Sequence, residues 1–146
     1  MHALTVTEYY GQDHQRLDEL LRRFEHLKDA DLSLAGCLFA EFKAGLERHI
    51  GWEEQILFPL FEAKTGMRDD GPTEVMRWEH RQILGLLAEI QARVAQRQAA
   101  PGPAVVALED LLRQHNQKEE QILYPVTDEL LSMSEREEVF AAMQRL

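Results

Sequence analysis

The strongest constraint on this chain is a segment that occurs twice, 66 residues apart. The first copy is residues 49–59 and the second is residues 115–125; each begins with histidine, ends with proline, and has Glu-Glu-Gln-Ile-Leu four residues after the histidine. The same shift aligns His14 with His80, although the surroundings of these two match less closely. Each half of the chain therefore carries a histidine, another histidine 35 residues later, and a glutamate four residues after that.

A histidine and a glutamate four residues apart lie on the same face of a helix, with their Cβ atoms about 5–6 Å apart. His49 with Glu53 and His115 with Glu119 are two such pairs. A lone histidine on an apolar face is most often a core or surface residue without a ligand. Two buried glutamates at the same offset are harder to explain, because burial is unfavourable unless each is paired or coordinated. The repetition therefore favours a metal site.

Together with His14 and His80, the two pairs form a set of six candidate ligands. Imidazole and carboxylate together suit iron, manganese or zinc, whereas copper(I) prefers sulfur. Carboxylates also bridge ions, so Glu53 and Glu119 could be shared between two sites. We therefore predict two metal ions per chain.

Other side chains beside these six need an interpretation. His2 and His26 have no partner at a matching height and are predicted to face solvent, whereas Trp52 and Trp78 are predicted to pack. Tyr10 lies one turn before His14 and could donate a hydrogen bond to a metal-bound oxygen. The candidate spare ligands, or supports of the ligands, are Glu54, Glu79, Glu120 and Tyr10.

Apolar residues recur at helical spacing along the chain, and no segment shows the alternation of a strand. Gly66 suits the left-handed residue that follows a helix, and Pro72 suits the first turn of the next one. The helices are predicted over about 12–28, from Leu34 to about 63, from Pro72 to about 98, from Val106 past 123, and from Ser134 onwards.

Two kinds of signal mark the helix ends and interruptions. Thr7 is predicted to cap the first helix, and Ser134 with Glu137 forms the pattern of a capping box for the last. Pro59 and Pro125 lie late in long helical segments, where each must remove one intrahelical hydrogen bond. A kink or a restart is therefore predicted at both prolines.

Four long helices joined by short turns predict an all-α fold, an up-down-up-down four-helix bundle with a short extra C-terminal helix. His14 and His49 lie at similar distances from the turn between their helices, as do His80 and His115, so at about 1.5 Å per residue they reach similar heights. We expect a single domain, 1–146, with an internal two-fold repeat whose halves span about 7–66 and 72–131.

Composition limits the classes of function. A net charge of −10 with scattered basic residues argues against nucleic acid and membrane surfaces as partners, and 45% apolar residues suffice for a core. No apolar run approaches the length of a membrane span and no secretory leader is recognisable, so a cytoplasmic protein is expected. The single cysteine, Cys37, cannot form an intramolecular disulfide and is predicted as a small buried residue.

From about Thr7 to Leu131 the sequence resembles the hemerythrin-like family of HHE cation-binding domains. The resemblance implies a four-helix bundle that holds two non-haem irons, bridged by carboxylates and by an oxo or hydroxo group, with manganese or zinc less expected. It implies terminal ligands at His14, His49, His80 and His115, and bridging carboxylates at Glu53 and Glu119.

The sequence departs from the oxygen-carrying members of that family. Those members have a fifth histidine one turn before the position of His80, where this chain has Met76. The second bridging residue, Glu119, also follows its histidine by four residues, where those members have an aspartate five residues on. The resemblance is therefore closer to sensing and redox-reactive members.

Three classes of function remain. The leading interpretation is a binding or sensing protein that binds a small ligand such as oxygen or reports iron or redox state. The alternatives are an enzyme acting on oxygen, peroxide or nitric oxide, or with iron–sulfur repair-like activity, and a structural bundle that holds a metal. No catalytic acid, nucleophile or substrate loop is recognisable, so catalysis is not the first expectation.

Overall fold

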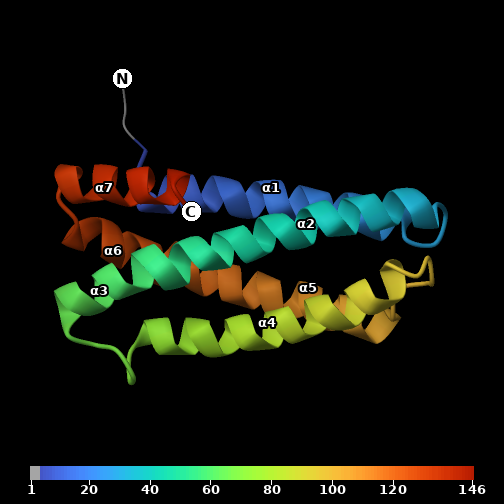
Figure 1. Ribbon diagram of the computed structural model, residues 1–146. Helices are drawn as coiled ribbons and strands as arrows, with labels where there is room; N and C mark the ends of the chain where they lie inside the picture. Colours follow the sequence, from blue (N-terminus) through green and yellow to red (C-terminus); the bar gives the residue numbers. More distant parts are fainter. Residues whose placement is uncertain (1–3) are drawn as a thin grey trace.

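The computed structural model describes residues 4–146, and within that range the chain consists of helices and turns without strands (Figure 1). Two of the long helical segments contain a short π-helical turn, labelled η. The elements are α1 (Val6–Leu27), α2 (Leu32–Trp52), η1 (Glu53–Leu57), α3 (Phe58–Thr65), α4 (Pro72–Val94), α5 (Gly102–Lys118), η2 (Glu119–Leu123), α6 (Tyr124–Leu130) and α7 (Met133–Gln144).

Four long helical segments pack side by side as a bundle, which confirms the predicted fold. The α1–α2 and α4–α5 turns lie at one end, and α3, α6 and α7 lie at the other (Figure 1). The C-terminal helix α7 lies against the first part of α1, where the rings of Tyr9 and Phe140 stack with centroids 4.8 Å apart. No helix within residues 4–146 combines the length and apolarity needed to cross a membrane.

The helix caps differ from the predicted ones by two residues at both ends of the chain. Helix α1 begins with a capping box formed by Thr5 and Glu8, and not at Thr7. Helix α7 is capped by Ser132 with Glu135, so the predicted box two residues later is wrong. Both segments contain the hydroxyl and carboxylate pattern at the earlier position, and the longer helix satisfies more backbone groups.

Other helix ends follow the local chemistry. Gly66 ends α3 with a φ of 75°, the left-handed conformation predicted for it, and Pro72 lies in the first turn of α4 as predicted. Helix α4 ends at Val94, four residues before the predicted end at 98. The chain then turns through Arg97, whose φ of 55° cannot continue a right-handed helix.

The expected kinks at Pro59 and Pro125 take the form of the π-helical turns η1 and η2. In these turns Phe58 donates its backbone N–H to Glu53, and Tyr124 donates to Glu119, five residues back in each case. A proline has no N–H to give the next α-helical bond, so the wide turn precedes it. Such single π turns are frequent at functional sites.

The buried apolar side chains form two clusters along the bundle axis. One fills the end with the α1–α2 and α4–α5 turns and includes Phe24, Phe39 and Leu87. The other, which includes Phe61 and Val139, fills the end with α3, α6 and α7. Along each long segment the candidate ligands fall between the residues of these two clusters, so the site lies inside the bundle between two apolar layers.

Several predicted core residues lie at the surface. Cys37 is exposed, which corrects its prediction as a buried residue. Trp78 is 55% exposed and does not pack in the core, unlike Trp52, which is 6% exposed. Val75 and Val106 are exposed too, because Met76 and Val105 are the residues that face the interior. The apolar periodicity of the sequence does not fix the rotation of these helices about their own axes to within one residue.

A carboxylate from the end of the bundle holds the start of α1. Asp128 on α6 accepts hydrogen bonds from the backbone N–H groups of Val6 and Thr7, at 2.7 and 3.0 Å, and from the Thr7 hydroxyl at 2.7 Å. These contacts satisfy N-terminal donors that the helix itself cannot pair. They also fix the first and the last long segments of the bundle against each other.

We predict that Asp128→Ala lowers the free energy of unfolding by about 1–3 kcal/mol, because it leaves the donors at the α1 N-terminus unpaired. Urea unfolding followed by circular dichroism measures this loss. The control is Glu129→Ala, an exposed neighbour, whose effect should stay within about 0.5 kcal/mol. Equal stability of the two variants would show that the contact contributes nothing.

Candidate metal centre

All six predicted ligands meet inside the bundle. Glu53 and Glu119 are each 0% exposed, and the four histidines are exposed by at most 3%. The imidazole rings of His14 and His49 lie 4.6 Å apart between centroids, and those of His80 and His115 lie 4.9 Å apart. The similar heights expected along the helices are therefore observed for both pairs.

Glu119 connects the two histidine pairs. Its Oε1 lies 3.2 Å from Nε2 of His14 and 3.3 Å from Nε2 of His115. Its ligand atoms belong to both groups that could hold an ion, one with His14 and His49 and the other with Glu53, His80 and His115. A carboxylate in this position can contact two ions at once.

Glu53 also faces both pairs, with one oxygen towards each. Its Oε1 lies 3.2 Å from Nε2 of His80, and its Oε2 lies 3.8 Å from Nε2 of His49. The four Nε2 atoms thus point inward around two carboxylates. This arrangement suits two cations that share Glu53 and Glu119.

Every one of the four histidines has its outer nitrogen held by a carboxylate. His14 donates from Nδ1 to Glu120 at 3.1 Å, and His80 donates to Glu54 at 2.6 Å. The neutral imidazole then presents a lone pair on Nε2, the form that binds a metal. Glu54 and Glu120 therefore orient these two imidazoles.

The other two histidines have equivalent supports. His49 donates from Nδ1 to Asp13 at 2.9 Å, and His115 donates to Glu79 at 2.8 Å, with Lys118 also bonded to Glu79. Glu79 was among the predicted supports, whereas Asp13 was missed. The signal was present, since the shift of 66 residues aligns Asp13 with Glu79.

The pKa values of the two central carboxyl groups shift in opposite directions. Burial, together with the negative charge of Glu119, raises the pKa of Glu53 above its usual value. Burial would do the same to Glu119, but the positive charge of His115 and hydrogen bonds from Glu53, His115 and His14 lower its pKa. Glu119 is thus the more acidic of the two carboxyl groups.

The neighbouring carboxylates also raise the pKa values of two of the imidazoles. Burial by itself would lower the pKa of His14, but hydrogen bonds with Glu119 and Glu120 and the negative charges of Glu119 and Glu53 outweigh it and raise the pKa to about 10. Glu53 and Glu54 have the same effect on His80, whose pKa is also about 10. These histidines hold protons at neutral pH unless another cation displaces them.

Three candidate ligand atoms at the centre lack the hydrogen bonds that buried polar atoms normally make, as expected where a cation would bind. Among the described residues, Oε1 of Glu53, Nε2 of His80 and Oε2 of Glu119 are buried without a hydrogen-bond partner. Buried polar atoms are seldom left unpaired. Their position, facing one another across the centre, fits nitrogen and oxygen ligands of iron, manganese or zinc.

Two buried tyrosines lie beside His14 and His49. Tyr10, predicted from its position one turn before His14, packs edge-on against His49 with ring centroids 5.4 Å apart, and its hydroxyl has no hydrogen-bond partner among the described residues. Tyr124 was missed. Its hydroxyl lies 2.6 Å from Oε2 of Glu53 and 3.1 Å from Oε1 of Glu119.

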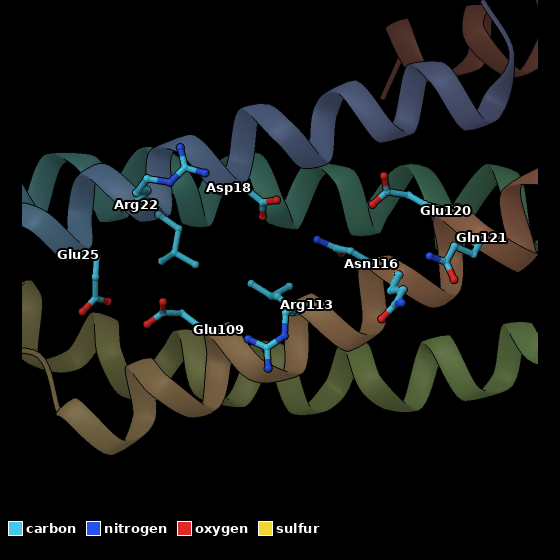
Figure 2. Close-up of a pocket in the computed structure, with 11 residues that line it drawn as sticks. Asp18, Arg22, Glu25, Glu109, Arg113, Asn116, Glu120 and Gln121 are labelled. Carbon is cyan, nitrogen blue, oxygen red and sulfur yellow. The ribbon is translucent and has the colours of Figure 1, made fainter.

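The remaining histidines do not join the centre. His26 is exposed on α1, as predicted, and His2 lies outside the described residues. Outside the centre, a cavity of about 670 Å³ lies between α1 and α5, lined by side chains that include Asp18, Arg22 and Glu120 (Figure 2). Glu120 therefore lies between this cavity and the outer nitrogen of His14.

Comparison with known proteins agrees with this geometry. The sequence profile of the hemerythrin HHE cation binding domain matches residues 5–127. An iron-sulfur cluster repair protein YtfE from Edwardsiella ictaluri is 33% identical over 95 residues, which is 61% of this chain and 43% of that protein. The YtfE protein of Yersinia pseudotuberculosis is 30% identical over 105 residues, 68% of this chain and 47% of its own length.

The chain thus spans less than half the length of these curated relatives. No solved structure matches it. The profile match nevertheless covers most of the chain, and the residues inside it are the ones that form the buried cluster of histidines and glutamates. The chain belongs to the hemerythrin HHE cation-binding domain family.

Proposed function

We propose that this protein is a non-haem di-iron protein that binds a small ligand such as oxygen and thereby senses oxygen, iron or redox state. The observation that carries the proposal is that Glu53 and Glu119, both fully buried, face the Nε2 atoms of two histidine pairs. In this proposal His14 and His49 hold one ion, His80 and His115 hold the other, and the two glutamates contact both.

Several contacts support binding of a small molecule in preference to a large substrate. The centre lies between two apolar layers, so only a small molecule can approach it without opening the bundle. The unpartnered hydroxyl of Tyr10 is a buried hydrogen-bond donor beside His49. A di-iron centre would supply coordination positions and redox chemistry, and the protein supplies a buried site and this donor.

Iron–sulfur cluster repair is the second candidate. It is favoured by the similarity to two proteins whose names state that activity. The matched part is less than half of those proteins, so we assign to this chain only the metal-binding part of such an activity. A repair assay with a damaged iron–sulfur protein as substrate distinguishes this candidate from sensing.

The first prediction is two iron ions per chain when the protein is produced in iron-replete cells and purified without chelators. Elemental analysis counts the ions, and near-ultraviolet absorption recorded before and after exposure to oxygen identifies the charge-transfer bands of bridged di-iron. Manganese gives a different spectrum and zinc gives none. A metal content near zero, or a single tightly bound zinc, would contradict the di-iron proposal.

A second prediction separates shared from terminal ligands. Glu119→Ala should lose both ions, because its carboxylate faces both histidine pairs, whereas His80→Ala should leave the site of His14 and His49 partly filled. Glu120→Gln is the matched control next to Glu119. It should keep two ions and weaken their binding by about 10–100-fold, since it alters only the support of His14. Two ions at unchanged affinity in Glu119→Ala would exclude it from the ligand set.

A third prediction concerns pH. A proton-loaded His14 or His80 stabilises the fold fully below the free-histidine pKa of about 6.5, and this stabilisation is lost as the pH rises towards 10, because the folded pKa is the higher one. Metal stabilisation changes in the opposite direction, because protons compete with the ion for imidazole. The difference in Tm between iron-loaded and chelator-treated protein should therefore widen between about pH 6 and pH 9.

Calorimetry of both forms across this pH range measures the difference. At free metal about 1,000 times above its Kd the added stability is about 4 kcal/mol. Hydrogen exchange near His49 and near His115 should rise together when the metal is removed, since both halves contribute ligands. Identical melting curves with and without chelator would mean that any bound ions are peripheral to the fold.

A further inference from the structure

We propose that Tyr124 is a phenolate ligand of the ion held by His14 and His49, which makes the two halves of the centre chemically unequal. This inference rests on the proposed di-iron function and adds a ligand to it. Four candidate ligand atoms surround the phenol oxygen of Tyr124, at 2.6 Å (Glu53 Oε2), 3.1 Å (Glu119 Oε1), 3.2 Å (His49 Nε2) and 3.4 Å (His14 Nε2).

These distances are those between neighbouring ligands of a single ion. Metal–nitrogen and metal–oxygen bonds of about 2.0–2.2 Å place adjacent ligand atoms about 2.8–3.6 Å apart in octahedral or tetrahedral geometry. Three of the four distances from the phenol oxygen fall in that range, and the fourth is close to it. The oxygen therefore occupies the position of one more ligand in the group formed by His14, His49 and the two glutamates.

Hydrogen bonding alone does not explain this position. A phenol has a single proton to donate, and the 2.6 Å contact with Glu53 uses it. The same oxygen still lies 3.1 Å from Oε1 of Glu119, which cannot receive that proton as well, and the two imidazole nitrogens can donate to it only while they hold protons that a metal would displace. A cation among these atoms would satisfy all of them.

The π-helical turn η2 brings Tyr124 to this place. Five residues separate it from Glu119, and in a regular α-helix that spacing would rotate its side chain away from the ligand face. In η2 the backbone N–H of Tyr124 bonds to the carbonyl of Glu119, so Tyr124 stacks one turn above Glu119. The wide turn thus places the ring over the centre, where it is 0% exposed.

The other half of the chain offers no such oxygen. The shift of 66 residues aligns Tyr124 with Phe58, whose ring stacks on His80 with centroids 5.8 Å apart and an interplanar angle of 10°. It also aligns Tyr10 with Met76, which is 3% exposed. The site of His14 and His49 therefore has phenol groups beside it, whereas the site of His80 and His115 has the phenyl ring of Phe58.

Ligation requires the phenol to lose its proton. On ligation the O–H bond of Tyr124 would break as the O–metal bond forms, and the proton would be released to solvent, since metal binding releases the protons of its ligands. Burial and the charges of Glu119 and Glu53 raise the pKa of the free phenol well above its usual value. A bound trivalent cation reverses this local effect, as metal ions do for coordinated thiols and water.

The test uses the three tyrosines of the chain, Tyr9, Tyr10 and Tyr124. The full-length protein is loaded with iron, oxidised to the ferric state and examined by visible absorption and resonance Raman spectroscopy. We expect a phenolate-to-iron charge-transfer band, with tyrosinate ring vibrations on excitation within it. Tyr124→Phe should abolish both signals, whereas Tyr9→Phe and Tyr10→Phe should keep them.

Phe58→Tyr is the complementary variant, because the internal repeat supplies the equivalent position. It should strengthen the tyrosinate signal by adding a phenol beside His80, and it should restore the signal when combined with Tyr124→Phe. Circular dichroism of each variant confirms that the helices are retained. The combined variant keeps the test valid even if Tyr124→Phe alone loads less iron.

Two results would overturn the assignment. One is a wild-type protein that binds two ferric ions without a tyrosinate signal, and the other is a signal that persists in Tyr124→Phe or disappears in Tyr10→Phe. Failure to bind iron at all contradicts the proposed di-iron function instead. Iron content measured on the same samples separates these cases.

Discussion

The structure depends on two carboxylates that no solvent reaches. Glu53 and Glu119 lie side by side at the centre of the bundle, where an isolated charge would be strongly unfavourable. Four imidazoles surround them, and protons or metal ions are the cations that can compensate the buried charge. The raised pKa values of His14 and His80 show how strongly the site attracts positive charge. The same attraction makes metal binding a competition with protons.

The carboxylates bonded to the outer nitrogens of the four histidines fix the geometry of the centre. Each imidazole is fixed through Nδ1 by a carboxylate on a neighbouring segment, so all four Nε2 atoms point inward. Glu54 and Glu120 directly follow the central glutamates in sequence, yet each supports a histidine of another helix. The central pair and its supports therefore tie the bundle together through one connected network. The apolar layers on both sides flank its central pair, which is fully buried.

The two halves of the internal repeat can be compared residue by residue, and the positions at which they differ show how the two histidine pairs differ in their surroundings. Where both copies keep the same residue, as at His49 and His115, each side chain makes the equivalent contact from Nδ1 to a carboxylate. Where they differ, as at Phe58 and Tyr124, one half has an apolar phenyl ring, and the other has a phenol that can donate a hydrogen bond or coordinate a metal. Two ions in such a centre would differ in ligand set and in redox behaviour. A sensing or reactive protein can use such a difference, because a small ligand then has a preferred side.

The sequence by itself determined the fold class, the six central side chains and three of the four supporting carboxylates, because helical periodicity and a repeat of 66 residues place His49, Glu53 and their counterparts on inward faces. It misplaced Cys37 and Trp78, since an error of one position in helix rotation moves a residue from core to surface. Only the tertiary structure decided which carboxylate holds which histidine, as for Asp13 and His49, because such pairs form between helices. It also decided the position of Tyr124. A π turn before Pro125 rotates that residue towards the central glutamates, and regular helical spacing could not predict it.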